Sequence, residues 1–367
     1  MNYKVTALTP LLVGDGRALS PIDYMVWKDQ VNVLDQPRIF RLLARGPRLD
    51  GYLAQLRKAA KLDFASWGGF AQNFSERRIP FENAESTAIW NAAPSDLLFI
   101  PTFAADHRGP YFPASAMKGA LRTGFVFSRS SPAVIERAAA LLEGDRVPRH
   151  LGEAVEAGAH ASQARRIAVA DSAPVSMSAF RIFLTRVASL DTRQASKPQL
   201  VWKIAGRGSV PPNRVAESTP TFAEMAIPGA SFTGEWDDRG RSGPDVKTFV
   251  DAANRFASAQ LDLHARYAEI ANLAPLQETI QRLKQELAAV QNETNACFLC
   301  VGWGSGFLSK SAFPDTGQES YRKILRAVPS IGKSLREGVP FPKTRRVVFL
   351  GGRTATLPGW VKLELEP

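Results

Sequence analysis

The stretch Cys300-Val-Gly-Trp-Gly-Ser-Gly-Phe-Leu-Ser-Lys310 has a glycine at every second position, an aromatic residue between the first two glycines, and a lysine four residues after the last. Glycine is needed where the backbone turns with a positive φ or lies against a ligand. The N–H groups of such a loop can bind phosphate oxygens, and a lysine adds a positive charge. The stretch therefore predicts either a loop that binds a polyanion or a tight turn beside a core tryptophan. The residues concerned are Gly302, Trp303, Gly304, Gly306 and Lys310.

The spacing of these glycines differs from that of the two common nucleotide-binding loops. A Walker loop has a glycine directly before its lysine, where this chain has Ser309, and a Rossmann loop needs a glycine where this chain has Phe307. Both loops also lie between a strand and a helix. Here a long region that we predict to be helical precedes the loop, and Pro314 follows it. An enzyme that binds a nucleotide through this loop is therefore disfavoured.

The composition favours a cytoplasmic protein with an anionic partner. The chain has 367 residues, of which 45% are hydrophobic and 22% charged, and its formal net charge is +11. This length is sufficient for two domains, and the positive charge suits a polyanion. No stretch approaches the roughly 18 apolar residues of a membrane-spanning helix, so we expect no membrane partner. Cys297 and Cys300 lack a second ligand pair or a thioredoxin-like context, so we expect reduced thiols.

The hydrophobic pattern predicts an α+β protein without regular alternation of strands and helices. Residues 3–9 and 359–365 alternate as strands do, and Glu224–Trp236 predicts a strand interrupted at Pro228-Gly229. Residues 116–127, the alanine-rich stretch 132–163 and the region 246–296 are predicted to be helical, the last of these with a break near Pro275.

A second informative segment is a proline-containing loop that leads into the helix predicted over 116–127. Ser115 is predicted to be the N-cap of this helix. Lys118 and Arg122 are four residues apart and share one face, and Gly119 would let a ligand approach closely. A helix N-terminus favours phosphate, so the segment predicts phosphate binding. The alternative is a capped surface helix with two solvated cations. The segment reads Tyr111-Phe-Pro-Ala-Ser-Ala-Met-Lys-Gly-Ala-Leu-Arg122.

A third candidate is the basic cluster Pro342-Lys343-Thr344-Arg345-Arg346, which directly precedes a predicted strand. Basic clusters are usually solvated surface. Beside a glycine-rich loop, however, this one could extend a groove that follows an RNA backbone.

No residue pattern indicates a metal site or a catalytic set, and we expect no cofactor. None of the histidines has the spacing of a metal ligand, and the common hydrolase and metalloprotease motifs are absent. A metal-independent endoribonuclease would need a general base near the phosphodiester, for which His107 is the best candidate. Asp171 is predicted to serve in a cap or a turn. The histidines are His107, His150, His160 and His264.

Together these segments resemble the RAMP-superfamily proteins of CRISPR systems. The resemblance extends over nearly the whole chain, although Ala114 and Ala116 replace a glycine and a serine that are usual in the family. Residues 307–310 and 342–346 make the chain most similar to the fifth subunit of the type III-A Csm effector complex. The segments that carry the resemblance are 8–16, 20–24, 111–122, 169–172 and 302–306.

The resemblance implies two ferredoxin-like (RRM-type) domains with helical insertions, which we expect over residues 1–180 and 181–367, although strands can be interleaved between them. It implies a non-catalytic RNA-binding subunit that caps the 3′-end side of the crRNA and supports crRNA maturation and antiviral defence. The implied partners are crRNA, target RNA and the neighbouring Csm backbone and small subunits, with host nucleases as further candidates. The residues expected to bind RNA are Ser115, Lys118, Gly119, Arg122, Gly302, Gly304, Gly306, Lys310, Lys343, Arg345 and Arg346.

Overall fold

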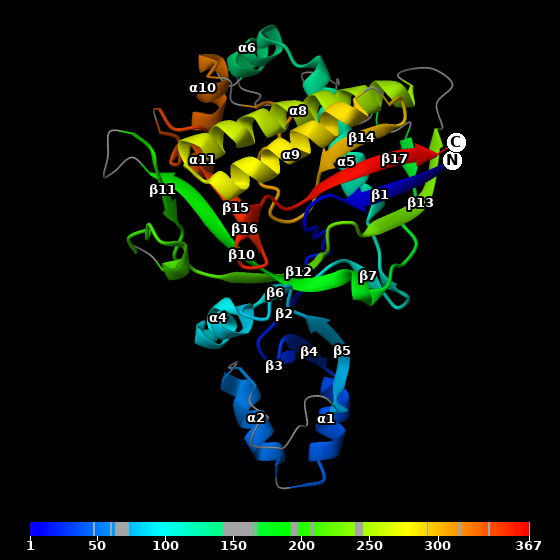
Figure 1. The fold of residues 1–367 in the computed structure, drawn as a ribbon, viewed down its shortest axis with the longest axis vertical. Helices are drawn as coiled ribbons and strands as arrows, with labels where there is room; N and C mark the ends of the chain where they lie inside the picture. The colour runs from blue at the N-terminus through cyan, green and yellow to red at the C-terminus, as the bar shows by residue number, and fades with distance from the viewer. Residues whose placement is uncertain are drawn as a thin grey trace.

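Strand β1 (Asn2–Ala7) lies at the centre of a five-stranded sheet, and both of its neighbours come from far along the chain. It pairs antiparallel with β13 (Ser231–Asp238) on one side and with β17 (Trp360–Glu366) on the other, so the two termini lie side by side (Figure 1). The outer strands are β14 (Ala296–Cys300) and β9 (Ile167–Val169). This sheet crosses the expected boundary near residue 180, and the two halves of the chain are interleaved in it.

The second sheet is built around the long strand β10 (Phe180–Asp191), which pairs antiparallel with β11 (Gln199–Trp202), β12 (Thr221–Ala226) and β15 (Thr344–Leu350). A short strand, β16 (Thr354–Thr356), extends it beyond β15. The predicted interruption at Pro228-Gly229 is confirmed, because β12 ends before it and β13 begins after it. At this point the chain leaves the second sheet and enters the first.

Helices pack over these sheets (Figure 1). The helical region predicted over 246–296 is a hairpin of α8 (Val246–Ile270) and α9 (Ala274–Val290), with Asn272 at a positive φ of 49° in the turn. Helix α5 (Ala114–Arg129) packs against α8, and a Cβ on Gly124 would lie 3.0 Å from the Cα of Ala253. The small residue at this crossing therefore brings the two backbones close together.

A separate lobe projects from the second sheet (Figure 1). It contains an antiparallel sheet of β3 (Tyr24–Trp27), β4 (Gln30–Leu34) and β5 (Ser75–Pro80), with α1 (Gln36–Leu43) and α2 (Leu49–Lys58) below. Its apolar core continues into the second sheet, and an Arg77–Glu224 ion pair crosses the junction. The remaining elements are β2 (Ala18–Leu19), α4 (Ser86–Ala92), β6 (Ile100–Pro101), β7 (Ala105–Asp106), β8 (Gly109–Pro110), α6 (Pro132–Leu141), α10 (Glu319–Ala327) and α11 (Pro329–Gly332).

This computed structural model confirms the α+β class. The predicted alanine-rich helix 132–163 is observed as α6, and its remainder, 142–163, lies outside the described residues, as do His150 and His160. The described residues are 1–46, 48–58, 61–62, 73–141, 164, 167–191, 197–206, 209–238, 245–291, 293–314, 317–336 and 338–366.

The edge strand β14 is fastened to α8 by one side chain, which gives a stability prediction. Asn254 is 4% exposed; its amide nitrogen donates to the carbonyl of Ala296 at 3.0 Å, and its amide oxygen accepts from the N–H of Phe298 at 3.0 Å. We expect Asn254→Leu to lower the free energy of unfolding by about 2–6 kcal/mol, because it orphans two backbone groups and each costs about 1–3 kcal/mol. Urea denaturation would measure this loss. Asn213→Leu, at an exposed loop position, is the control, and equal losses in both variants would contradict the prediction.

Candidate nucleic-acid interface

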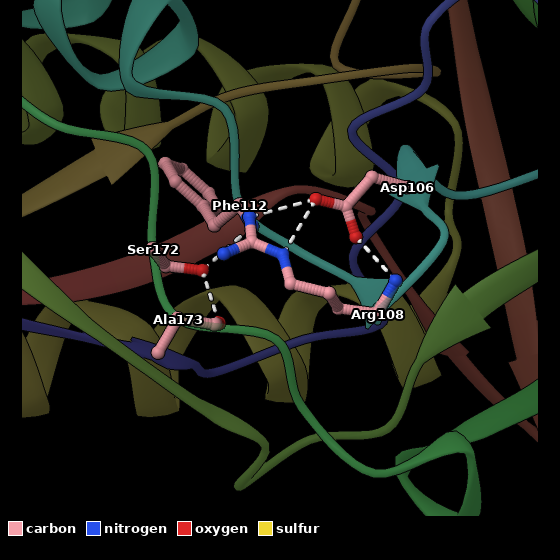
Figure 2. A network of polar contacts seen from close by, with 5 residues as sticks. All are labelled: Asp106, Arg108, Phe112, Ser172 and Ala173. Carbon is pink, nitrogen blue, oxygen red and sulfur yellow. Dashed lines mark hydrogen bonds and ion pairs between the residues drawn. The ribbon is translucent and has the colours of Figure 1, made fainter.

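The proline-containing loop before α5 is fastened to the segment that follows β9. The hydroxyl of Ser172 accepts from the N–H of Phe112 at 2.8 Å and donates to the carbonyl of Ala173 at 2.8 Å (Figure 2). The N–H of Ser172 donates in turn to the carbonyl of Phe112 at 3.1 Å. Since the Phe112 ring is also fully buried, the position and direction of α5 are set by a segment some sixty residues away in the chain.

Asp171 is the cap of α5. Its carboxylate accepts from the N–H of Ala114, the first helical residue, at 2.7 Å. The predicted capping role of Asp171 is confirmed, and the expectation that Ser115 is the N-cap is wrong, because Ser115 is the second residue of the helix. A carboxylate already interacts with the positive end of the helix dipole. The N-terminus of α5 is therefore a poor place for a phosphate, and the cations that could attract one lie farther along the helix.

Two such cations follow on α5. Lys118 and Arg122 are both half-buried, and their spacing of four residues places them on one face of the helix. Gly119 is exposed, and a Cβ there would meet no atom within 4 Å, so space is open beside it. Arg122 also lines a pocket of about 360 Å³ that Lys310 lines as well. The fold thus brings together cations from the first and second sequence segments.

The three loop glycines all have left-handed backbone, with φ of 82°, 81° and 80°, but their surroundings differ. A Cβ on Gly302 would overlap the carbonyl oxygen of Leu12, which accepts from the N–H of Trp303 at 2.7 Å. A Cβ on Gly304 would lie 2.9 Å from the side chain of Arg346. Gly306 is exposed and has no neighbour within 4 Å of such an atom. Gly302 and Gly304 are thus required by packing inside the protein, and Gly306 lies open to a ligand.

The element before this loop differs from the expectation. The predicted helical region ends at Val290, and the strand β14 lies between it and the loop, so the loop follows a strand as a nucleotide-binding loop would. Residues 306–310 form turns, so the helix of a nucleotide-binding loop does not follow. A cavity of about 30 Å³ beside Gly304 and Gly306 has room for about one water molecule. The turns at 306–310 and the small size of this cavity disfavour a nucleotide-dependent enzyme.

Trp303 packs against the main core, as one of the two interpretations predicted, and it also supports Arg346. The guanidinium of Arg346 lies 4.1 Å from the centroid of the indole ring and donates to the hydroxyl of Thr185 at 3.1 Å. Partial burial lowers the pKa of Arg346 from its usual value. Arg346 is therefore a positioned, half-buried cation at the edge of the glycine loop.

Arg345 lies on the opposite face of the same strand. The basic cluster does not precede the strand, since β15 begins at Thr344, and consecutive residues of a strand point to opposite faces. Arg345 is 6% exposed, and it donates to Nδ1 of His264 at 2.9 Å and to the carbonyl of Pro342 at 2.6 Å. Burial lowers its pKa to about 10. Arg345 thus stabilises the interior, and we remove it from the expected RNA contacts. Lys343, just before the strand, is half-buried.

The catalytic alternatives gain no geometric support. His107 is exposed at the tip of the β7–β8 hairpin, beside an ion pair of Asp106 and Arg108 at 2.7 Å (Figure 2). Burial, together with the adjacent Arg345, lowers the pKa of His264 well below its usual value and keeps the ring neutral. Within the described residues, no three His, Cys, Asp or Glu side chains are arranged to hold a metal ion. None of the described helices has the length and apolarity needed to cross a bilayer.

Comparisons with known proteins agree with this geometry. The family model of the RAMP superfamily matches residues 4–309. The protein named CRISPR system Cms protein Csm5 from Methanocaldococcus jannaschii is 20% identical over 411 aligned residues, covering 100% of this chain and 89% of that protein. A chain of a Csm–crRNA–target RNA ternary complex of a type III-A CRISPR-Cas system has the same fold, with a TM-score of 0.63 and 20% sequence identity. The match covers 99% of this chain and 100% of that one. The crystal structure of the Csm5 of T. onnurineus also has this fold, with a TM-score of 0.59 and 17% sequence identity. The match covers 99% of this chain and 100% of that one.

The different surroundings of Gly302 and Gly306 give a matched pair of substitutions. We expect Gly306→Ala to lower the free energy of unfolding by about 1–2 kcal/mol, the cost of left-handed backbone for an L-residue. Gly302→Ala should lose about 1–3 kcal/mol more, because its Cβ overlaps the Leu12 carbonyl. Chemical denaturation of both variants would measure this difference. Equal losses would show that backbone conformation alone, and not contact with residue 12, requires Gly302.

Proposed function

The chain belongs to the RAMP superfamily, and we propose that it is a non-catalytic RNA-binding subunit of a type III-A CRISPR (Csm) ribonucleoprotein. The observation that carries this proposal is the convergence of two cationic segments, since Arg122 of α5 and Lys310 of the glycine loop line the same pocket. Support for a Csm-type assembly comes from the likeness to Csm5 proteins and to a chain of a Csm–crRNA–target RNA complex.

The mechanism is electrostatic and independent of RNA sequence. Lys118, Arg122 and Lys310 hold phosphate oxygens, and the open space beside Gly119 and Gly306 lets the RNA backbone approach the protein. Arg346 and Lys343 extend this surface along the second sheet, and the exposed Ser115 can donate a hydrogen bond at its other end. Gly302 and Gly304 contribute indirectly, because their close packing fixes the course of the loop.

The resemblance to the fifth Csm subunit supports a particular position in the complex. We place the chain at the 3′-end side of the crRNA, where it supports guide maturation and antiviral defence. Its partners are then crRNA, target RNA, and the neighbouring backbone and small subunits, with host nucleases as further candidates. A role as the trimming endoribonuclease itself receives less support, because His107 lies on a hairpin separate from Arg122 and Lys310.

Salt-dependent RNA binding tests the proposed contacts. We expect Lys118→Ala, Arg122→Ala and Lys310→Ala each to weaken binding to a short single-stranded RNA. Each should also reduce the slope of log affinity against log salt concentration by about 0.7, the value for one lost phosphate contact on a single strand. Fluorescence anisotropy over a salt series would measure both quantities.

Arg282→Ala is the matched control, because Arg282 is an exposed cation on α9, paired with Glu286 at 3.6 Å, and lies outside the Arg122–Lys310 pocket. Its slope should equal that of the unaltered chain. Unchanged slopes in all three test variants would remove these residues from the RNA interface.

Affinity purification of the tagged protein from its native host tests the assembly. We expect Csm-type subunits to co-elute with small RNAs that carry a repeat-derived 5′ tag and a spacer, because the proposed partners of this subunit are the other Csm subunits and their crRNA. Mass spectrometry and small-RNA sequencing of the eluate would identify both. Elution of the protein alone, without enriched small RNA, would refute its role as a Csm subunit.

A further inference from the structure

The pocket that contains Arg122 and Lys310 has an apolar interior that phosphate binding does not explain. Its volume is about 360 Å³, within the roughly 300–1,000 Å³ typical of small-ligand sites. Helix α5 forms one side, the end of the glycine loop a second, and α10 with α11 the third. The apolar lining includes Phe307, Phe313, Tyr321, Ile324, Val328 and Ile331.

The aromatic walls are held in place by their own packing. Phe313 and Tyr321 are buried, with ring centroids 6.4 Å apart and planes inclined by 37°. Phe307 is half-buried and packs edge-on against Phe341, with centroids 5.1 Å apart. The Tyr321 hydroxyl lies 3.4 Å from the hydroxyl of Ser311, which also lines the pocket. Val328, by contrast, is 40% exposed. The pocket therefore combines fixed rings and hydroxyls with an accessible wall.

The charge of the lining selects among possible ligands. Of the described lining residues, Arg122 and Lys310 are cations and none is an acid. The adjoining helix α10 carries further basic residues, Arg322, Lys323 and Arg326. A ligand that satisfies both the walls and the rim needs a flat apolar part and an attached anion. An RNA nucleotide has this combination, since unstacked bases pack on aromatic side chains while phosphates bind Arg and Lys.

We propose that this pocket takes one unstacked nucleotide of a bound RNA. Its base lies against the half-buried Phe307 and the exposed Val328, which line the pocket together with the buried rings of Phe313 and Tyr321, and its phosphate is bound by Arg122 and Lys310. This inference rests on the proposed RNA-binding function and adds a base-binding site to it. The nucleotide is either the last one of the strand or an internal one turned out of the stack, and the experiment below separates these two sources.

The test uses the full chain and a short oligouridine with a single 4-thiouridine. The thiouridine is placed first at the 3′ end and then at successive internal positions. After irradiation, mass spectrometry maps the crosslinked residues. We expect one position to crosslink to Phe307 or to another accessible residue that lines the pocket. If it is the 3′-terminal position, the pocket holds the end of the strand, and an internal position identifies a turned-out base. Crosslinks confined to residues outside the pocket, with RNA bound, would overturn the proposal.

A pocket-filling variant separates the base from the phosphate contribution. Val328→Trp places an indole at the accessible wall and leaves both cations unchanged. We expect about tenfold weaker RNA binding, equivalent to about 1.4 kcal/mol and within the range for one stacked base, with loss of the crosslink and an unchanged salt slope. The matched control is Val210→Trp, on a loop where valine is 72% exposed and does not line the pocket.

The outcomes of these measurements are distinguishable. Val328→Trp protein that binds and crosslinks like the unaltered chain would overturn the pocket proposal and leave the RNA-binding function intact. Failure of the unaltered chain to bind RNA in a salt-dependent way would refute the function and the pocket together. The crosslinking experiment requires no substitution, so it decides the question even if Val328→Trp does not fold.

Discussion

The pairing of β1 with β17 is the constraint on which the candidate interface depends. It carries the segment after β1 alongside the last strand, where the N–H of Leu8 donates to the carbonyl of Trp360 at 2.9 Å and that of Gly359 donates to the carbonyl of Pro10 at 3.0 Å. Two residues later, the carbonyl of Leu12 accepts from Trp303. The glycine loop is thus held against the N-terminal segment by backbone contacts, which no change of side chain at Leu12 would remove.

The same sheet also determines where α5 lies. Asp171 and Ser172 follow β9, its edge strand, and they hold the first helical turn and the loop before it. On its other side, α5 approaches α8 closely at Gly124. Both cationic segments are therefore anchored to one rigid unit. Arg122 and Lys310 are long side chains on fixed backbones, a combination that lets them follow a flexible polyanion while their separation stays bounded.

The sequence predicted those parts of this arrangement that depend on local pattern. Periodicity identified the α8–α9 hairpin and the alternating strand β17, and the alternating glycines indicated left-handed backbone. Prediction from the sequence failed where a residue's hydrogen-bond partner lies far away in the chain. Ser115 had the right chemistry for a cap, but the carboxylate of Asp171, 57 residues away in the chain, occupies that position.

The prediction that the whole basic cluster 342–346 binds RNA failed for a related reason. Arg345 and Arg346 are adjacent in the chain, but once β15 begins at Thr344 they point to opposite faces, one into the core and one toward Trp303. The apolar pocket could not be predicted because its walls come from α5, the glycine loop and α10, which meet only in the folded chain. A long-range pairing leaves no periodic signal within either segment.

The position of Asp171 bears on where the proposed RNA contacts would be strongest. With a rise of about 1.5 Å per residue, Lys118 lies about 6 Å along the axis of α5 from Ala114, and Arg122 about 12 Å. The screening length at physiological ionic strength is about 8 Å. The carboxylate of Asp171 therefore opposes a phosphate at Lys118 more than one at Arg122. Arg122 and Lys310 line the aromatic pocket. Electrostatics therefore favours a phosphate at the same pocket whose shape suits a base. We expect the strongest phosphate contacts beside the proposed base site.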